Sequence, residues 1–182
     1  MVTNLQNNQD VSIYKMDVDD VESVGRMQMQ LWIETYVNKE FGVTEEWVRS
    51  RWENRLKPEI ILERKRKLAE DQKSAGKESF VAKNKEGKVI GVIGYSRDEN
   101  DRQELGMIYV EKSYHGKGVA DILMDKIIEW ADPQKDIYVG VVVYNNRAKA
   151  FYEKWGFREI EGSDKLFDGK LPEIMMARKG VK

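Results

Sequence analysis

Residues 108–120 read IYVEKSYHGKGVA, and this stretch decides how the rest of the chain is interpreted. Its apolar beginning predicts a strand, and Gly116 and Gly118 predict a turn from which a helix begins near Val119. The first turn of a helix has unsatisfied N–H groups and the positive end of the dipole, and glycine lets the main chain approach an anion closely. The stretch therefore predicts a phosphate or pyrophosphate site, with an ordinary strand-to-helix turn as the alternative for an isolated Gly-x-Gly.

Two well-known phosphate motifs do not match this turn. A Walker A loop would need glycine at position 111 and serine or threonine at position 118, where the chain has Glu111 and Gly118. The dinucleotide fingerprint would need glycine at position 121, where Asp121 stands. The sequence therefore supports neither an NTPase nor an NAD-dependent enzyme.

Outward from the turn, hydrophobic periodicity predicts an α/β domain with a mixed sheet. Upstream, we expect a strand at 12–16, a helix between Asp17 and Tyr36, a second helix at 44–56 that Pro58 ends or kinks, a charged helical stretch at 59–77, and strands at 80–82, 89–95 and 104–110. Downstream, we expect a helix at 119–130, a buried strand at 137–144, a helix at 148–155 stopped by Gly156, and strands at 157–161 and 173–177. The predicted order is β-α-α-β-β-β-α-β-α-β-β, with residues 1–10 as a loose tail and residues 11–182 as one domain.

The composition argues against several functional classes. The 182 residues carry 31 Lys and Arg against 32 Asp and Glu, and the resulting net charge of -1 disfavours generic nucleic-acid binding. The chain has no cysteine and one histidine, His115, which excludes a cysteine nucleophile and any thiolate or multi-histidine metal site. We expect no metal, no membrane span and no signal peptide, and a cytoplasmic protein. The basic run Arg64–Lys67 is either a nucleic-acid contact or a solvated helix face.

Two motifs together give a specific resemblance. His115-Gly116-Lys117-Gly118-Val119-Ala120 resembles the acyl-CoA pyrophosphate loop of the GNAT superfamily of N-acetyltransferases, Gln/Arg-x-x-Gly-x-Gly/Ala. Downstream, the segment from Asn145 through Ala148 and Tyr152 to Gly156-Phe157 is similar to the superfamily's second signature, Asn-x-x-Ala-x-x-x-Tyr followed by Gly-Phe. The resemblance covers residues 78–161 well. It implies a GNAT-like single α/β domain whose mixed, mostly antiparallel central sheet is flanked by helices.

The resemblance also implies which residues contact the cofactor. The main-chain N–H groups of residues 116–120 would hold the CoA pyrophosphate, the backbone of residues 108–110 would pair with the pantetheine arm, and Asn145 would hydrogen-bond that arm. His115 departs from the family pattern, and we expect it to act mainly through its main-chain N–H. The implied cofactor-binding residues are Ile108, Tyr109, Val110, His115, Gly116, Lys117, Gly118, Val119, Ala120, Asn145 and Ala148.

Two residues are candidates for the chemical step. The resemblance places Tyr152 near the sulfur as general acid, and a tyrosine with an ordinary pKa of about 10 is protonated at pH 7 and can donate to a thiolate. Without the surrounding motif, Tyr152 would be interpreted as a core residue, because it shares an apolar face with Phe151 and Trp155. Glu104 is either the base that deprotonates the amine, directly or through water, or a simple edge-strand charge.

The acceptor site is implied to lie against the first two helices and their connection. Trp32, Glu34 and Tyr36 are the candidate substrate-binding residues, together with acidic and aromatic residues at 40–47. Acidic groups and aromatic rings together suit a cationic amine through ion pairing and cation–π contact. The alternative is a set of exposed helix charges and buried aromatic rings. The layout loosely resembles that of bacterial polyamine acetyltransferases.

The implied function is transfer of an acetyl group from acetyl-CoA, as co-substrate, to a primary amine by direct attack in a ternary complex. The acceptor would be a small-molecule amine, a polyamine or another cationic compound. The alternatives are a non-catalytic acyl-CoA-binding sensor, a protein or peptide N-terminal acetyltransferase, and a nucleic-acid-associated protein. We expect no nucleic-acid or membrane partner, and the sequence leaves the oligomeric state, including a homodimer, open.

Overall fold

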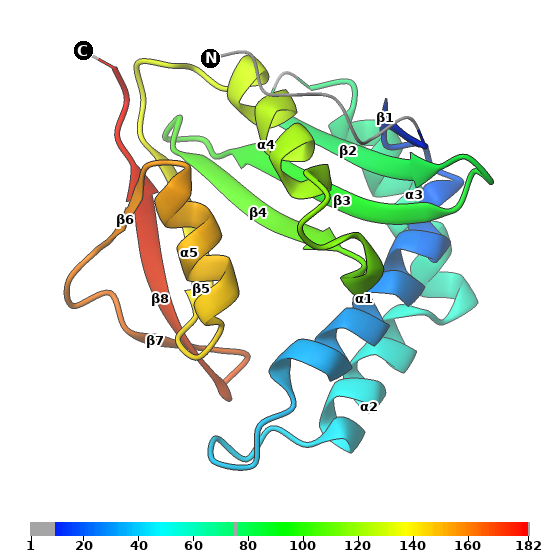
Figure 1. The fold of residues 1–182 in the computed structure, drawn as a ribbon. Coiled ribbons are helices and arrows are strands. Elements are labelled where there is room, and N and C mark those ends of the chain that lie inside the picture. The colour runs from blue at the N-terminus through cyan, green and yellow to red at the C-terminus, as the bar shows by residue number, and fades with distance from the viewer. Residues whose placement is uncertain (1–9, 75, 182) are drawn as a thin grey trace.

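The computed structural model describes residues 10–74 and 76–181, which form one sheet with helices on both faces (Figure 1). The strands are β1 (Val11–Lys15), β2 (Lys77–Asn84), β3 (Val89–Arg97), β4 (Gln103–Val110), β5 (Ile137–Val142), β6 (Phe157–Glu159), β7 (Lys165–Phe167) and β8 (Leu171–Arg178). The helices are α1 (Asp20–Tyr36), α2 (Glu45–Arg55), α3 (Pro58–Asp71), the 3-10 turn η1 (Lys112–Tyr114), α4 (Val119–Trp130) and α5 (Asn146–Lys154). The predicted class, α/β with a mixed and mostly antiparallel sheet, is confirmed.

The predicted order is wrong at two points. The order left out the charged helical stretch expected at 59–77, which the structure shows as a separate third helix, α3, with Pro58 in its first turn. Proline suits that position, since the first helical N–H groups have no intrahelical partner. The short strand β7 was not predicted, and its three residues are all exposed, so they carry no alternating pattern. The predicted tail falls on residues 1–9, which lie outside the described residues, and on Asp10.

The strand order in the sheet is β1-β2-β3-β4-β5-β8-β6, and β7 pairs with β8. All neighbours are antiparallel except β4 and β5, which pair in parallel over just two residue pairs, Gln103↔Ile137 and Glu104↔Tyr138. Beyond these pairs the two strands diverge toward Val110 and Val142. We call this opening the fork between β4 and β5.

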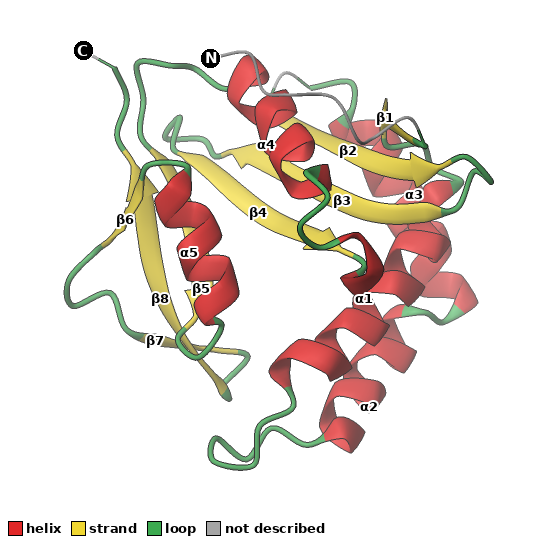
Figure 2. Ribbon diagram, in the orientation of Figure 1, coloured by secondary structure: helices red, strands yellow, loops and turns green. Residues whose placement is uncertain are grey.

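Helices cover both faces of the sheet (Figure 2). One face packs on α4 and α5 and forms the largest core cluster, which includes Leu123, Ile127, Val139 and Phe157. The other face packs on α1, α2 and α3 through two further clusters, one around Val24 and Val92 and one around Trp32 and Trp52. The fork therefore opens between helices of both layers.

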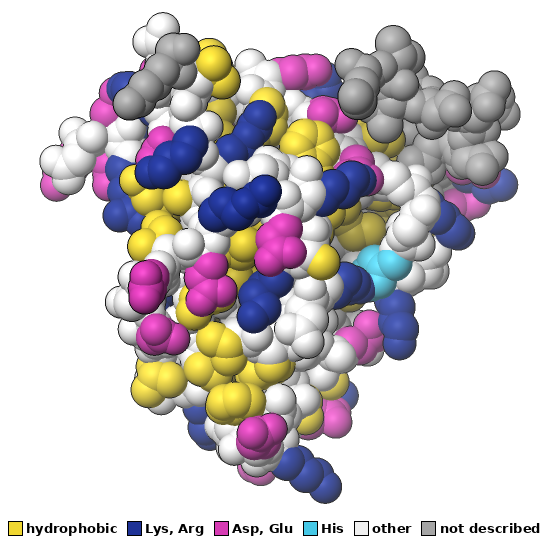
Figure 3. Space-filling view, turned by 60° about the vertical axis from the view of Figure 1, so that its left-hand side comes forward, with side chains coloured by type: hydrophobic (Ala, Val, Ile, Leu, Met, Phe, Trp, Pro, Cys, Tyr) yellow, Lys and Arg dark blue, Asp and Glu magenta, His cyan; other side chains and the backbone are white. Residues whose placement is uncertain are grey.

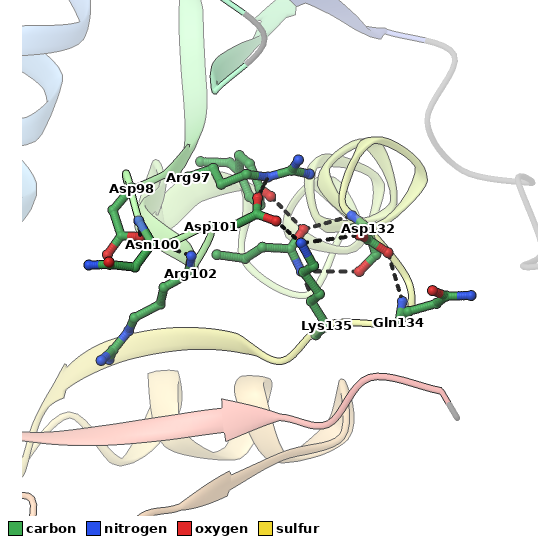
Figure 4. A network of polar contacts seen from close by, with 10 residues as sticks. Arg97, Asp98, Asn100, Asp101, Arg102, Asp132, Gln134 and Lys135 are labelled. Carbon is green, nitrogen blue, oxygen red and sulfur yellow. Dashed lines mark hydrogen bonds and ion pairs between the residues drawn. The ribbon is translucent and has the colours of Figure 1, made fainter.

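A buried polar network holds the closed end of the fork. Gln103 is fully buried, and its side-chain oxygen accepts hydrogen bonds from the Tyr95 hydroxyl at 2.6 Å and from the Asp132 N–H at 2.7 Å. Its amide donates to the carbonyl oxygens of Asp132 at 3.0 Å and Lys135 at 3.2 Å. Ion pairs of Asp101 with Arg97 and Lys135 surround this network (Figure 4). The contacts tie the start of β4 to the loop that leads into β5.

Charges of both signs are interspersed on the face seen in Figure 3, where basic and acidic side chains alternate between apolar ones. Within the part of the chain that the structure describes, none of the helices combines the length and the apolar character needed to cross a bilayer.

Candidate active site

The turn after β4 has the geometry of an anion site. Gly116 and Gly118 have φ of 74° and 80°, a left-handed conformation that favours glycine, and Gly118 is the N-cap residue of α4. The first hydrogen bond from α4 into this turn runs from the N–H of Ile122 to the carbonyl of Gly118 at 3.0 Å. The N–H groups of Gly116, Gly118, Val119 and Ala120 have no acceptor among the described residues. A helix N-terminus with free N–H groups favours a phosphate.

His115 does not take the role expected from the sequence. Its main-chain N–H donates to the carbonyl of Lys112 at 3.1 Å, so this group closes the η1 turn. Its ring Nε2 lies 2.9 Å from the carbonyl oxygen of Val110, and the guanidinium of Arg147 lies against the same ring. Burial lowers the pKa of His115, and the positive charge of Arg147 lowers it further. At pH 7 the ring is therefore neutral, and it links β4 to the start of α5.

A cavity of about 400 Å³ runs from the turn toward the fork. Its lining includes most of the expected cofactor-binding residues: Ile108, Tyr109, Val110, His115, Gly116, Gly118, Val119, Ala120, Asn145 and Ala148. Lys117 is in the turn but not in this lining. Beside the turn, Asp121 in the first turn of α4 pairs with Lys154 of α5 at 2.7 Å, and this contact offsets its acidic charge. Arg147, which also lines the cavity, adds a positive charge to it.

Asn145 is the N-cap residue of α5. Its side-chain oxygen accepts a hydrogen bond from the N–H of Ala148 at 3.2 Å, which satisfies one of the first N–H groups of the helix. The carbonyl oxygen of this side chain is therefore used within the protein. Its amide group hydrogen-bonds the Tyr36 side chain, and its second N–H can still donate to a molecule in the cavity.

Three tyrosines from different elements meet where the cavity reaches the fork: Tyr36 at the end of α1, Tyr109 on β4 and Tyr152 on α5. The Tyr109 hydroxyl accepts a hydrogen bond from Nε1 of Trp32 at 2.9 Å. Burial raises the pKa of all three tyrosines. The negative charge of Glu173 adds to the rise in the pKa of Tyr36 and Tyr152, which places this carboxylate near both rings. All three hydroxyls are therefore protonated at neutral pH.

A second cavity of about 120 Å³ lies on the other side of the fork. It shares Tyr36, Ile108, Tyr109, Asn145, Ala148 and Tyr152 with the first cavity. Its remaining walls come from Trp32 on α1, from Gly106 and Met107 on β4, from β5, and from Phe167, Leu171 and Glu173 in the hairpin of β7 and β8. The two cavities therefore meet at Tyr152, one on the side of the anion turn and one on the side of the β7–β8 hairpin.

The structure does not bring Glu34 and Glu104 to this place. Glu34 is exposed, accepts a hydrogen bond from Gln30 at 2.8 Å, and lines a separate hollow beside Lys112 and Ser113. Glu104 is exposed at the closed end of the fork, where β4 and β5 still pair, and lines neither cavity. Trp32 and Tyr36, by contrast, lie where the acceptor wall was expected. The carboxylate in the second cavity is Glu173.

The lining residues that the sequence analysis missed include Arg147, Gly140 and Glu173. One signal was available, because a glycine inside a buried apolar strand such as 137–144 marks a close approach of another group. The approaching group is the Glu173 carboxylate, whose atoms lie 2.6–2.8 Å from where a Cβ on Gly140 would be. The sequence did not indicate which residue approaches, because β8 follows β5 only after a helix and two further strands.

Comparison with known proteins agrees with this geometry. Residues 42–157 match the family model described as acetyltransferase (GNAT) family. This match covers more than half of the chain, and the chain therefore belongs to the GNAT acetyltransferase family. The resemblance drawn from the two motifs is confirmed.

The individual proteins that this chain resembles align with different shares of its length. An uncharacterized N-acetyltransferase from Mycobacterium bovis is 32% identical over 77 residues, which are 40% of this chain and 48% of that protein. N-acetylaspartate synthetase from Xenopus tropicalis is 33% identical over 78 residues, 41% of this chain and 29% of that protein. The chain thus spans about half or less of the curated relatives it matches. The PaiA N-acetyltransferase from Thermoplasma acidophilum, solved in complex with coenzyme A, has a TM-score of 0.73 at 21% identity and covers 94% of this chain and 99% of that chain.

Proposed function

We propose that this protein transfers an acetyl group from acetyl-CoA to a primary amine by direct attack in a ternary complex. The observation that carries the proposal is the pair of cavities that share one wall at Tyr152. A thioester carbonyl in the first cavity and an amine in the second would meet there. Membership of the GNAT family supports acetyl transfer as the reaction class.

The cofactor site fits a CoA molecule on its chemistry. The unpartnered N–H groups of the turn suit the pyrophosphate, and the apolar part of the cavity suits the pantetheine arm. The structural likeness to a protein solved with coenzyme A supports the same assignment. In this proposal acetyl-CoA supplies the activated acetyl group, and residues 108–120 with Asn145 and Ala148 bind and orient it. Arg147 joins them beside the turn.

Tyr152 is proposed to act on the leaving sulfur. Its buried hydroxyl is protonated at neutral pH and can donate a hydrogen bond, and then a proton, to the thiolate that forms. The amine attacks the carbonyl carbon, the carbon–nitrogen bond forms and the carbon–sulfur bond breaks. No covalent intermediate with the protein is involved. The proposed acceptor is a small cationic amine such as a polyamine.

The test is thiol release from acetyl-CoA in the presence and absence of amines, together with calorimetric titration of CoA. Gly118→Glu should abolish CoA binding, because it places a carboxylate where the pyrophosphate is proposed to lie. Gly162→Glu is the matched control, since Gly162 also has a positive φ of 70° and a Cβ there would meet open space. If Gly118→Glu binds CoA like the parent, the cofactor site is misplaced.

Two rival functions give different outcomes in the same assay. A non-catalytic acyl-CoA sensor would bind acetyl-CoA but release no thiol with any amine. A protein or peptide N-terminal acetyltransferase would release thiol with peptides and not with small amines. Amine-dependent thiol release with a small alkylamine would favour the proposed function over both.

A further inference from the structure

We propose that Glu173 is the residue that recognises the acceptor, by binding the ammonium group of an alkylamine and accepting its first proton before attack. This inference rests on the proposed acetyl transfer and deepens it, because it names the substrate class and the group that selects it. The cavity concerned is the second one, between Trp32 of α1, β5 and the hairpin of β7 and β8.

The position of the carboxylate is built into the sheet. Glu173 lies on β8 opposite Val142 of β5, and its side chain leans along β5 over Gly140. Any side chain at position 140 would meet the carboxylate, since an added Cβ would lie 2.6 Å from its Cδ. The Glu173 side chain is only 13% exposed. The absence of a side chain at Gly140 thus leaves room for the largely buried Glu173 carboxylate beside the fork.

The charge of the cavity defines what it can bind. Among the described residues that line it, Glu173 is the single charged side chain, and the others are aromatic, aliphatic or amide groups. A buried charge is costly unless it is paired, and within the protein Glu173 is paired with the half-exposed Lys165, so an acceptor that displaces Lys165 should bring a positive charge of its own. An acceptor with its own carboxylates, such as aspartate, would find no cation in this lining, since Arg51, which lies over the rings of Trp32 and Phe167, is paired with Asp168. The cavity therefore favours an alkylammonium over an amino acid.

The carboxylate already binds a primary ammonium group within the protein. Nζ of Lys165 on β7 lies 3.0 Å from Oε2 of Glu173, and the Lys165 side chain is half exposed. The other oxygen, Oε1, has no partner among the described residues. A substrate ammonium can therefore bind Oε1 or displace Lys165. The rings of Trp32 and Phe167 already hold a cation within the protein, because the Arg51 guanidinium lies 5.2 Å and 5.4 Å from their centroids.

The proton balance is complete with the groups present. The ammonium gives one proton to Glu173, which passes it to solvent, and the free amine attacks the thioester carbonyl. As the carbon–sulfur bond breaks, the sulfur takes a proton from Tyr152, and the nitrogen gives its second proton back to that oxygen. The products are the N-alkylacetamide, CoA thiol and one released proton.

The experiment compares Glu173→Gln with the parent on n-butylamine, spermidine, aspartate and hydroxylamine, by thiol release from saturating acetyl-CoA. We expect kcat/KM for the two alkylamines to fall about 10²–10⁴-fold, the range for loss of an acid–base group. The rate with hydroxylamine, which is uncharged at pH 7, should change little. The loss of kcat/KM with n-butylamine should become smaller as the pH rises toward the amine's own pKa of about 10, because more of the amine is then already deprotonated in solution.

Two variants and one ligand measurement separate this inference from the proposed function. Glu173→Asp keeps the charge and should recover part of the alkylamine activity. Glu159→Gln, an exposed carboxylate on the neighbouring strand β6, should behave like the parent. CoA affinity, measured by calorimetry, should be unchanged in every variant.

Equal losses with butylamine and hydroxylamine in Glu173→Gln would overturn the inference, and so would a parent that acetylates aspartate but neither alkylamine. A parent that binds acetyl-CoA and releases no thiol with any nucleophile would instead remove the proposed function.

Discussion

At the scale of single residues, the feature with the most consequence is the buried hydroxyl of Tyr152. Burial raises its pKa first, and the nearby Tyr36 and Glu173 raise it further. A raised pKa moves deprotonation of the hydroxyl to a higher pH. The hydroxyl of the folded protein is therefore protonated at neutral pH. The same rise makes it a weaker acid than an ordinary tyrosine, so we expect it to act on a sulfur that already carries developing negative charge.

Tyr152→Phe should therefore reduce kcat by about 10²–10⁴-fold, the usual range for a general acid. The KM for acetyl-CoA should barely change, because the lost interaction belongs to the transition state. In the parent, kcat should not decline between pH 7 and 10 through ionisation of Tyr152, since its pKa is raised. The measurement is thiol release at saturating acceptor across that range. Near-parent kcat in the phenylalanine variant would mean that water or another group protonates the sulfur.

Asn145 is a second residue with two separable roles. Asn145→Ala removes the cap of α5 and should cost about 0.5–2 kcal/mol in the free energy of unfolding. Asn145→Asp keeps an oxygen that can cap the helix, so its stability should stay close to that of the parent. Both variants lose the amide donor that faces the cavity and should bind CoA more weakly. Urea unfolding and calorimetry measure the two effects, and intact CoA affinity in Asn145→Asp would show that the side chain only caps α5.

At the scale of elements, the fork between β4 and β5 depends on what closes one end of it. The network around Gln103 ties β4 to the loop before β5, at the end where the two strands form their two parallel residue pairs. Beyond the network nothing pairs the two strands, and the edges of both strands then line the cavities. The site is thus placed by a structural element that contains none of the proposed reacting groups.

Gln103→Leu should destabilise the protein by more than a surface change, because it leaves several buried polar groups without partners, each at about 1–3 kcal/mol. Urea unfolding measures the loss, with Gln134→Leu as control, since Gln134 is exposed in the same loop. We also expect a lower kcat in the folded fraction of Gln103→Leu, because β4 is then no longer held to the loop before β5 by the contacts of Gln103. A stability change no larger than that of the control would mean that the network does not hold the strands.

At the scale of the whole molecule, the proposed cofactor site joins parts that are distant in sequence. Residues of α1, β4, the 115–120 turn and α5 all line the first cavity, and the Asp121–Lys154 pair links α4 to α5 across it. A ligand that contacts all of these parts should bind the folded protein and not the unfolded chain. Its binding should therefore stabilise the fold as a whole.

CoA at about 100 times its Kd should stabilise the protein by about 2.7 kcal/mol, through mass action alone. For a domain of about 150–250 residues, 1 kcal/mol shifts Tm by about 2–4 °C, so a rise of about 5–11 °C is expected. Thermal unfolding with and without CoA measures it, and Gly118→Glu serves as the unresponsive control. A parent Tm that does not change when CoA is added would contradict the proposed cofactor site.

The sequence by itself determined the strand–turn–helix at 108–120, the Asn145 cap, the stop at Gly156 and most of the strands and helices. These signals are local, since periodicity, capping and left-handed glycines act within a few residues of each other. Only the tertiary structure decided that Glu173, and not Glu34 or Glu104, is the carboxylate in the second cavity, and that the ring of His115 braces β4 against Arg147. Those placements depend on which strand lies beside β5 and on which side of α1 faces the sheet. Strand neighbours and helix facing are set by the packing of the entire core, to which residues far apart in sequence contribute together.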